Sequence, residues 1–303
     1  MTIIVAFQQE PALFYSSVII FSLLVGSFLN VVIHRIPVMM KREAKQDCSE
    51  FFAEHYPDAL STHGHDSVKA PTQSLNKYNL IVPRSACPHC GHLITAMENI
   101  PVISYLFLKG KCRDCGSKIS MRYPFVELLS AVFVIVVALK FGVSYQTLFA
   151  AFFTWALLAL TFIDLDTQYL PDQITLPFLW LGLLINLDNT FTDVQSALIG
   201  AAVGYLSLWS VYKVFKLLTG KEGMGYGDFK LLAMIGAWCG WQVIPAVILI
   251  SSVIGSIAGI LMIVTKYHEK GKPIPFGPYL AGAGWIVLLW GTEINNTYLK
   301  LYS

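Results

Sequence analysis

The sequence predicts an all-α protein that crosses a membrane about eight times and carries a small zinc-ribbon-like domain after its first membrane helix. Three observations predict this fold class. The chain of 303 residues is 55% hydrophobic and only 13% charged, whereas soluble globular chains carry about 25% charged residues. From residue 124 onward it is a series of apolar runs, most of which reach the roughly 17–25 residues of a spanning helix with their flanks. Two cysteine pairs lie in the polar segment that follows the first run.

The first apolar run, residues 13–33, is expected to be a retained membrane helix. No Lys or Arg precedes Arg35, whereas a secretory signal peptide begins with positive charge. A basic cluster that starts at His34 and ends at Lys45 follows the run at once, and basic residues favour the cytoplasmic side of a bilayer. We therefore expect a periplasmic N-terminus and a cytoplasmic segment after the first helix.

Residues 37–122 are expected to form one cytoplasmic domain, between a first membrane helix within residues 1–36 and a seven-helix membrane domain of residues 123–303. The segment is rich in Pro, Ser, His and charged residues, and it has no apolar run long enough to cross a bilayer. Its first half, residues 46–80, is expected to be rich in loops, with His63 and His65 solvated rather than bound to a metal.

The cytoplasmic segment holds two Cys-x-x-Cys pairs, Cys87 with Cys90 and Cys112 with Cys115. The spacing between the pairs is close to that of a zinc ribbon, and a glycine after each pair permits a tight turn. Disulfides are disfavoured in the reducing cytoplasm. We therefore interpret the four thiolates as ligands of one structural zinc ion, because a site closed by four cysteines leaves no open position for catalysis. Free thiols and a redox pair are the alternatives.

Seven further apolar runs bring the expected number of membrane helices to eight. The short run of residues 229–240 is kept as a crossing because the lysines of residues 266–272 would otherwise lie outside, against the positive-inside bias. Gly200 and Gly204 have the four-residue spacing that lets helices pack closely in lipid. The centres of the seven runs lie near residues 125–141, 147–163, 176–187, 194–215, 229–240, 243–264 and 279–290.

Two aspartates stand at the ends of apolar runs, and the expected topology places both at the cytoplasmic face. Asp164 follows the run of residues 147–163, and Asp228 precedes the run of residues 229–240. Carboxylates at membrane segments are costly and indicate function. Two carboxyl groups held together cannot both ionise, which is how aspartic proteases keep one acid and one base. We therefore predict an intramembrane aspartyl peptidase, in which the sequence does not distinguish the two roles.

Asp228 ends the motif formed by Gly225, Tyr226, Gly227 and Asp228. Glycine on both sides of the tyrosine permits backbone conformations that a Cβ forbids and lets another segment pass close by. Taken alone, the motif fits better with a glycine-rich loop whose aspartate caps a helix. Together with Asp164, we interpret it as the active-site loop. The alternatives are a proton-coupled transporter, although transporter sites tend to lie near the membrane midplane, and a non-catalytic assembly factor for a pilus or secretion machine.

In combination, these motifs resemble the bacterial type IV prepilin leader peptidases, which are bifunctional peptidases and N-methyltransferases of the Gly-x-Gly-Asp membrane aspartyl protease class. The likeness extends over nearly the whole chain and keeps the order of the family's motifs. The matching segments are residues 26–32 and 35–40, the two cysteine pairs, residues 98–101, 163–172, 223–230 and 274–279.

The resemblance implies the substrate and the catalytic pair. The family removes the short basic leader from type IV prepilins and type II secretion pseudopilins, on the cytoplasmic side and after a glycine. Asp164 and Asp228 occupy the positions of the family's catalytic aspartates. Asp166 and Asp172, expected in a polar loop after Asp164, could attract the basic leader.

The resemblance also implies a second activity, methylation of the new N-terminal residue (commonly Phe) with S-adenosylmethionine. Methyl transfer in the family is associated with the cytoplasmic domain, where Glu98, Asn99 and Gly110 are our candidates for cofactor binding. No Gly-x-Gly-x-x-Gly loop after a strand indicates a dinucleotide-type fold for this site. The expected setting is the bacterial inner membrane, with pilins and lipid as partners and without nucleic acid. The oligomeric state is left open.

Overall fold

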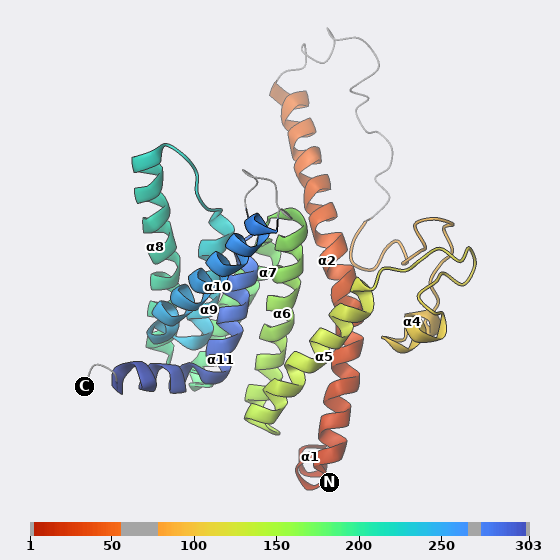
Figure 1. The fold of residues 1–303 in the computed structure, drawn as a ribbon, viewed down its shortest axis with the longest axis horizontal. Helices are drawn as coiled ribbons and strands as arrows, with labels where there is room; N and C mark the ends of the chain where they lie inside the picture. Colours follow the sequence, from red (N-terminus) through yellow and green to blue (C-terminus); the bar gives the residue numbers. More distant parts are fainter. Residues whose placement is uncertain (1–2, 56–77, 266–273, 301–303) are drawn as a thin grey trace. The chain divides into compact units, whose positions relative to one another are not determined.

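The computed structural model describes residues 3–55, 78–265 and 274–300, which contain helices and connecting segments without a named β-strand (Figure 1). The chain divides into two compact units. Residues 1–26 and 127–303 form the first, called the membrane unit here, and residues 27–126 form the second, called the knuckle unit.

The all-helical membrane fold expected from the sequence is confirmed, and each of the eight apolar runs lies largely within a helix. The number of crossings stays a prediction. Among the described residues, five helical stretches are long and apolar enough to span a membrane. They are α2 (Pro11–His55), α5 (Arg122–Phe141), α6 (Tyr145–Thr167), α8 (Val194–Thr219) and the stretch Trp241–Val264, which joins the 3-10 helix η3 (Trp241–Val243) to α10 (Ile244–Val264).

Helix α2 extends far beyond the apolar run that predicted it. It follows the short helix α1 (Ile3–Gln9), passes through Pro37 and ends at His55. The expectation that residues 46–80 are rich in loops is therefore wrong for residues 46–55. One reason is that this stretch contains no Gly or Pro to end the helix, and the Gln46 side chain donates to Glu50 at 2.7 Å, one turn later. His63 and His65 lie outside the described residues.

Within the knuckle unit, Arg35 of α2 binds the segment that leads into the first cysteine pair. Its guanidinium donates to the carbonyl oxygens of Asn79 at 2.8 Å and of Pro83 at 2.6 Å, and it lies over the ring of Tyr78. The side chain is only 7% exposed. Arg35, which the sequence analysis used only as part of the basic cluster after the first run, is therefore a buried anchor, because a charged guanidinium forms strong hydrogen bonds with backbone oxygens.

Helix α9 (Tyr226–Cys239) forms the centre of the membrane unit. Ten of its 14 residues are buried, and it packs against α8, α7 (Asp172–Ile185) and α11 (Gly277–Lys300). A helix of this length spans about 21 Å, less than the bilayer core of about 30 Å. Its apolar character is explained by burial in protein, since a helix that is hydrophobic on all sides is a buried helix.

Close backbone packing joins α8 to α9, as the spacing of Gly200 and Gly204 predicts. A Cβ at Gly204 would lie 2.6 Å from the carbonyl oxygen of Leu232, and Gly200 faces the backbone of Gly236. Small residues permit this approach because dispersion contacts between backbones replace side-chain packing. This close approach to α8 is one of the contacts that position α9.

The far end of α9 is closed by Asn186, which is fully buried in the 3-10 helix η2 (Asn186–Asp188). Its amide donates to the carbonyl oxygens of Ala237 at 2.9 Å and Trp238 at 3.1 Å. These are among the last carbonyls of a helix, which have no partner within the helix itself. The opposite end, where α9 begins, lies beside the end of α6 and the start of α11 (Figure 1).

Candidate functional site

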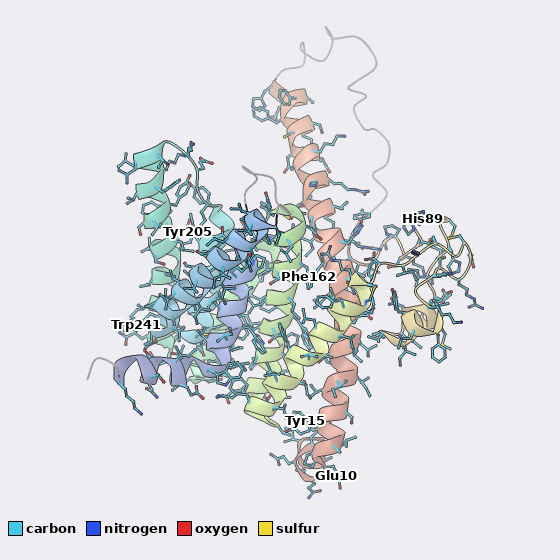
Figure 2. All side chains as sticks on the ribbon, viewed as in Figure 1. Glu10, Tyr15, His89, Phe162, Tyr205 and Trp241 are labelled. Atoms are coloured by element: carbon cyan, nitrogen blue, oxygen red, sulfur yellow. The ribbon has the colours of Figure 1, made fainter. Side chains whose placement is uncertain are left out.

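The two aspartates that the sequence pattern paired meet at one end of the membrane unit. Asp164 lies near the end of α6, and Asp228 lies in the first turn of α9. Both side chains are buried, at 5% and 8% exposure. The carboxyl groups are near enough for the charge of Asp164 to act on Asp228. Figure 2 labels Phe162, close to this end of α6, and Trp241, which follows α9 toward the other end.

Gly277, the first residue of α11, holds the Asp164 carboxylate. Its backbone N–H donates to Oδ2 of Asp164 at 3.0 Å. The first N–H groups of a helix have no partner within the helix and carry its positive end charge, so this position stabilises an anion. A Cβ on Gly277 would lie 2.6 Å from the same oxygen. Only glycine therefore fits here without moving the carboxylate.

Sequence reasoning assigned no role to Gly277, although a signal for it was present. Pro278 follows it, and proline is favoured at the first position of a helix. The pattern thus indicated a helix start with free N–H groups. It carried no information about which acceptor, far away in the chain, those groups would meet.

The residues expected to form an active-site loop lie where α9 begins: Gly225 precedes the helix, and Tyr226 and Gly227 are its first two residues, so the expectation of a loop is wrong for these two. The two glycines leave space for a neighbour rather than adopting unusual backbone angles. Neither Gly225 nor Gly227 is among the glycines with a positive φ. A Cβ on Gly227 would instead lie 2.8 Å from Cβ of Leu170. The buried side chain of Leu170 also lies 3.2 Å from the Cβ position of Gly277. Leu170, which sequence reasoning did not single out, therefore packs between the two helix starts that flank the aspartates.

Tyr226, the first residue of α9, packs against the end of α8. Its ring centre lies 5.5 Å from that of Tyr212 and 5.4 Å from that of Phe229. Tyr212 also donates from its hydroxyl to Glu222 at 3.3 Å, and Glu222 forms an ion pair with Lys216 at 2.6 Å. These contacts hold the segment between α8 and α9 in place. Tyr226 therefore helps to position the start of α9, where Asp228 lies.

An ion pair joins α9 to the start of α7. Nζ of Lys230 lies 2.7 Å from Oδ1 and 2.6 Å from Oδ2 of Asp172. Asp172 is the first residue of α7, and Asp166 lies within α6, so the expectation of a polar loop for both acids is wrong. The idea that both acids attract a basic leader is weakened, because Lys230 already balances one of them.

The four cysteines of the knuckle unit form a cluster that could bind a metal ion. Their sulfur atoms all lie within 4.8 Å of one another. The Sγ atoms of Cys87 and Cys115 are 3.8 Å apart, and those of Cys90 and Cys112 are 3.9 Å apart. A tetrahedral ion with metal–sulfur bonds of about 2.3 Å holds its sulfurs about 3.8 Å apart. The donor set therefore fits one four-coordinate ion.

The two cysteine pairs form matching knuckles, and the glycine after each pair is required by its backbone. Gly91 and Gly116 have φ angles of +75° and +69°, a region that favours glycine. Their N–H groups donate to the carbonyl oxygens of Cys87 at 2.9 Å and Cys112 at 3.0 Å. A short antiparallel bridge closes each knuckle. The tight turns expected from the sequence are confirmed.

The three candidates for cofactor binding lie near one another in sequence but have different surroundings. Glu98 accepts hydrogen bonds from Thr95, through N–H and hydroxyl, and from His92, which together lower the pKa of Glu98 to about 2. Asn99 accepts a hydrogen bond from the Ser27 hydroxyl at 3.4 Å. Gly110, with a φ of +67°, packs directly against the ring of Tyr105. Of the three, Glu98 alone lines the hollow in this region.

Comparisons with known proteins agree with this arrangement. Residues 20–141 match the model of the bacterial peptidase A24 N-terminal domain, and residues 151–260 match that of the type IV leader peptidase family. A prepilin leader peptidase/N-methyltransferase of Aeromonas salmonicida (strain A449) is 55% identical, over 96% of this chain and 95% of its own length. Proteins of the same name from Stutzerimonas stutzeri and Pseudomonas aeruginosa are 50% and 52% identical, over 99% and 96% of both chains. No solved structure matches. The chain therefore belongs to the type IV leader peptidase family.

Proposed function

We propose that this protein is a membrane aspartyl endopeptidase and N-methyltransferase of the bacterial inner membrane. It removes the leader from type IV prepilins and type II secretion pseudopilins after a glycine, and it then methylates the new N-terminal residue, commonly Phe, with S-adenosylmethionine. The single observation that carries the peptidase is the pair of buried carboxyl groups, Asp164 and Asp228, in a chain so similar to proteins with this name. The active site and the knuckle unit face the cytoplasm, and the N-terminus faces the periplasm.

The aspartates act as one acid–base pair. One carboxylate takes a proton from water as the water attacks the scissile carbonyl, and the protonated partner donates to the carbonyl oxygen as the tetrahedral intermediate forms. The Gly277 N–H donates to Asp164, and a hydrogen bond of this kind favours the ionised form. We therefore assign the base to Asp164 and the acid to Asp228. The pair titrates as a unit because the two charges interact.

The position of the pair suits a membrane-anchored substrate. Both aspartates lie at helix ends, Asp164 near the end of α6 and Asp228 at the start of α9. A prepilin is held by an apolar N-terminal helix, so its cleavage point lies at the membrane interface. Burial excludes bulk water from the pair, which strengthens the electrostatic interactions that act on the reacting groups.

The knuckle unit serves the second activity. Zinc bound by the four cysteines is structural, because all four positions of the ion are taken by thiolates. S-adenosylmethionine, when bound, supplies an activated methyl group. The N-terminal amine forms the new carbon–nitrogen bond with its lone pair, the carbon–sulfur bond breaks to leave S-adenosylhomocysteine, and the amine loses a proton. Glu98, Asn99 and Gly110 remain the candidates that the sequence proposed for this site.

The deciding experiment uses the purified full-length protein in detergent with a purified prepilin and labelled S-adenosylmethionine. We expect a product that has lost its leader and carries one added methyl group, both visible in its mass. A proton-coupled transporter would leave the prepilin intact and move protons in liposomes. A non-catalytic assembly factor would bind the prepilin without cutting it, and either result would overturn the peptidase.

Removal of one cysteine ligand is expected to remove the metal. Cys112→Ser leaves three thiolates for an ion that structural sites bind with four ligands, so metal affinity should fall. We expect one zinc per chain in the native protein and almost none in the variant, measured by elemental mass spectrometry. The rate of methyl transfer should fall together with the zinc content, while the rate of leader cleavage should stay within about twofold of the wild-type rate. Cys48→Ser, outside the cluster, is the control and should keep its zinc. Full zinc in Cys112→Ser would contradict the assignment.

Gly277→Ala is expected to slow leader cleavage strongly without unfolding the protein. The added methyl group would lie 2.6 Å from Oδ2 of Asp164, so the carboxylate has to move, and small misplacements of catalytic groups cost about 10²-fold in rate. The measurement is the initial rate of leader release. Gly282→Ala in the same helix is the matched control, since its Cβ meets nothing within 4 Å. Equal rates for the two variants would contradict the role of this N–H.

A further inference from the structure

A hollow of about 300 Å³ opens in the knuckle unit, between the 3-10 helix η1 (Met97–Asn99), α4 (Ile103–Phe107) and the second cysteine knuckle. Small-molecule sites have volumes of about 300–1,000 Å³, with mostly apolar walls and a few polar groups that orient the ligand. This hollow has that composition, with one acidic and one basic side chain. Its principal lining residues are Met97, Glu98, Ile103, Phe107, Leu108 and Arg113.

The polar end of the hollow presents two opposite charges. Oε1 of Glu98 lies 3.9 Å from the Arg113 guanidinium, too far for a direct hydrogen bond. The Glu98 side chain is only 9% exposed and is oriented by Thr95. The Arg113 side chain is 68% exposed, so a ligand can reach it. A ligand that carries both a cation and an anion would meet a partner for each.

The cysteine cluster lies next to this charged pair. Arg113 stands between the ligands Cys112 and Cys115. Its neighbour Asp114 pairs with His92 at 2.8 Å, and the same histidine lies 3.1 Å from Glu98. The two knuckles and η1 are thus joined by one network of charged groups. An ion bound by the four cysteines would therefore stabilise the hollow through this network, although no cysteine lines the hollow.

The apolar end of the hollow exposes large side chains to solvent. Phe107 is 83% exposed, Met97 76% and Ile103 51%. Apolar groups gathered in this way on a protein surface indicate a binding site. An accessible phenyl ring can stack on a flat heteroaromatic base, a contact that contributes about 1–3 kcal/mol for a nucleobase on an aromatic side chain.

We propose that this hollow binds S-adenosylmethionine, with Arg113 on the amino-acid carboxylate, Glu98 on the cationic groups and Phe107 against the adenine. The ligand combines a zwitterionic amino acid, a sulfonium and a flat base, and the hollow offers a counterpart to each. The proposal rests on the methyltransferase half of the proposed function. Asn99 and Gly110 are then positioning residues, because Asn99 contacts Ser27 and Gly110 supports Tyr105.

The test is calorimetric titration of S-adenosylmethionine into the full-length protein in lipid nanodiscs, with leader cleavage and zinc content measured on the same samples. We expect Arg113→Gln and Phe107→Ala each to weaken binding about tenfold or more, as the loss of one charge-assisted hydrogen bond or one stacking contact predicts. The matched controls are Lys118→Gln and Ile81→Ala, which are exposed and lie outside the hollow. Zinc content should show that the Arg113 and Phe107 variants remain folded, and the two control variants should keep wild-type donor affinity and cleavage.

Each other outcome overturns the assignment in a recognisable way. Unchanged affinity in Arg113→Gln and Phe107→Ala, with normal methylation by the wild type, would place the donor elsewhere and leave the proposed function standing. A raised Michaelis constant for the prepilin, with donor affinity unchanged, would show that the hollow receives the pilin instead. A wild type that cleaves but neither binds S-adenosylmethionine nor methylates would remove this inference and the methyltransferase function together, while the peptidase would stand.

Discussion

Asp164→Asn and Asp228→Asn should each stop leader cleavage while the protein stays folded and inserted. An amide has nearly the shape of a carboxyl group but cannot exchange a proton with water near neutral pH. Loss of a general acid or base costs about 10²–10⁴-fold in rate, and each variant removes one member of the proposed acid–base pair. The measurement is the initial rate of leader release from a purified prepilin, with size-exclusion elution as the test of folding.

The control for this pair is Asp188→Asn, which changes an exposed aspartate of η2 in the same unit. It should cleave at the wild-type rate. Groups that act as a unit show non-additive effects, so the double variant of Asp164 and Asp228 should lose little more than either single one. Complete leader removal by either purified single variant would end the assignment of a catalytic pair.

Gly200→Leu is expected to have the largest effect on stability. Gly200 faces the backbone of Gly236, so a leucine would force α8 away from α9, the helix that carries Asp228. Overpacking of a closely packed site costs about 1–3 kcal/mol and at times more. In a chain of this size we expect the melting temperature in detergent to fall by about 5 °C or more, with loss of cleavage.

Gly282→Ala serves as the control for this prediction too, because a Cβ there meets nothing within 4 Å. Alanine is a better helix former than glycine by about 1 kcal/mol, so this variant should melt at or above the wild-type temperature. The packing argument would be wrong if Gly200→Leu melted with the wild type and cleaved at its rate.

Much of the site was predictable because its signals are short and local. Cys87 with Cys90, and Cys112 with Cys115, have a spacing that sets up two knuckles, and the glycine after each pair marks its turn. The helices of the membrane unit could be placed from apolar runs, since length and hydrophobicity determine where a chain can be helical in lipid. The pairing of the two aspartates followed from topology, because each lies at a helix end.

The missed residues share one property: their roles depend on a partner that is distant in the chain. Gly277 is hydrogen-bonded to Asp164, which lies 113 positions earlier in the chain, and Lys230 is bound to Asp172, which lies 58 positions earlier. No periodicity connects such positions. The contacts of Arg35 could not be predicted for the same reason, since its partners Asn79 and Pro83 lie 44 and 48 positions further along the chain.

The length of α2 was missed for a different reason. Its second half is polar, so hydropathy ended the predicted helix near residue 33, whereas helix propensity continued it to His55. In the same way, hydropathy could not separate a buried core helix from a membrane span for α9, because both are apolar on all sides. Short apolar runs need the packed structure before they can be assigned.

The sequence by itself determined the helical membrane fold, the cysteine cluster and the two aspartates, because each depends on residue type and local spacing. Only the tertiary structure decided that the Gly277 N–H holds Asp164, that α9 is enclosed by α8, α7 and α11, and that Glu98 and Arg113 border one hollow. The physical reason is that composition and periodicity act along the chain. Hydrogen bonds, burial and charge complementarity act through space, between segments whose approach no local pattern specifies.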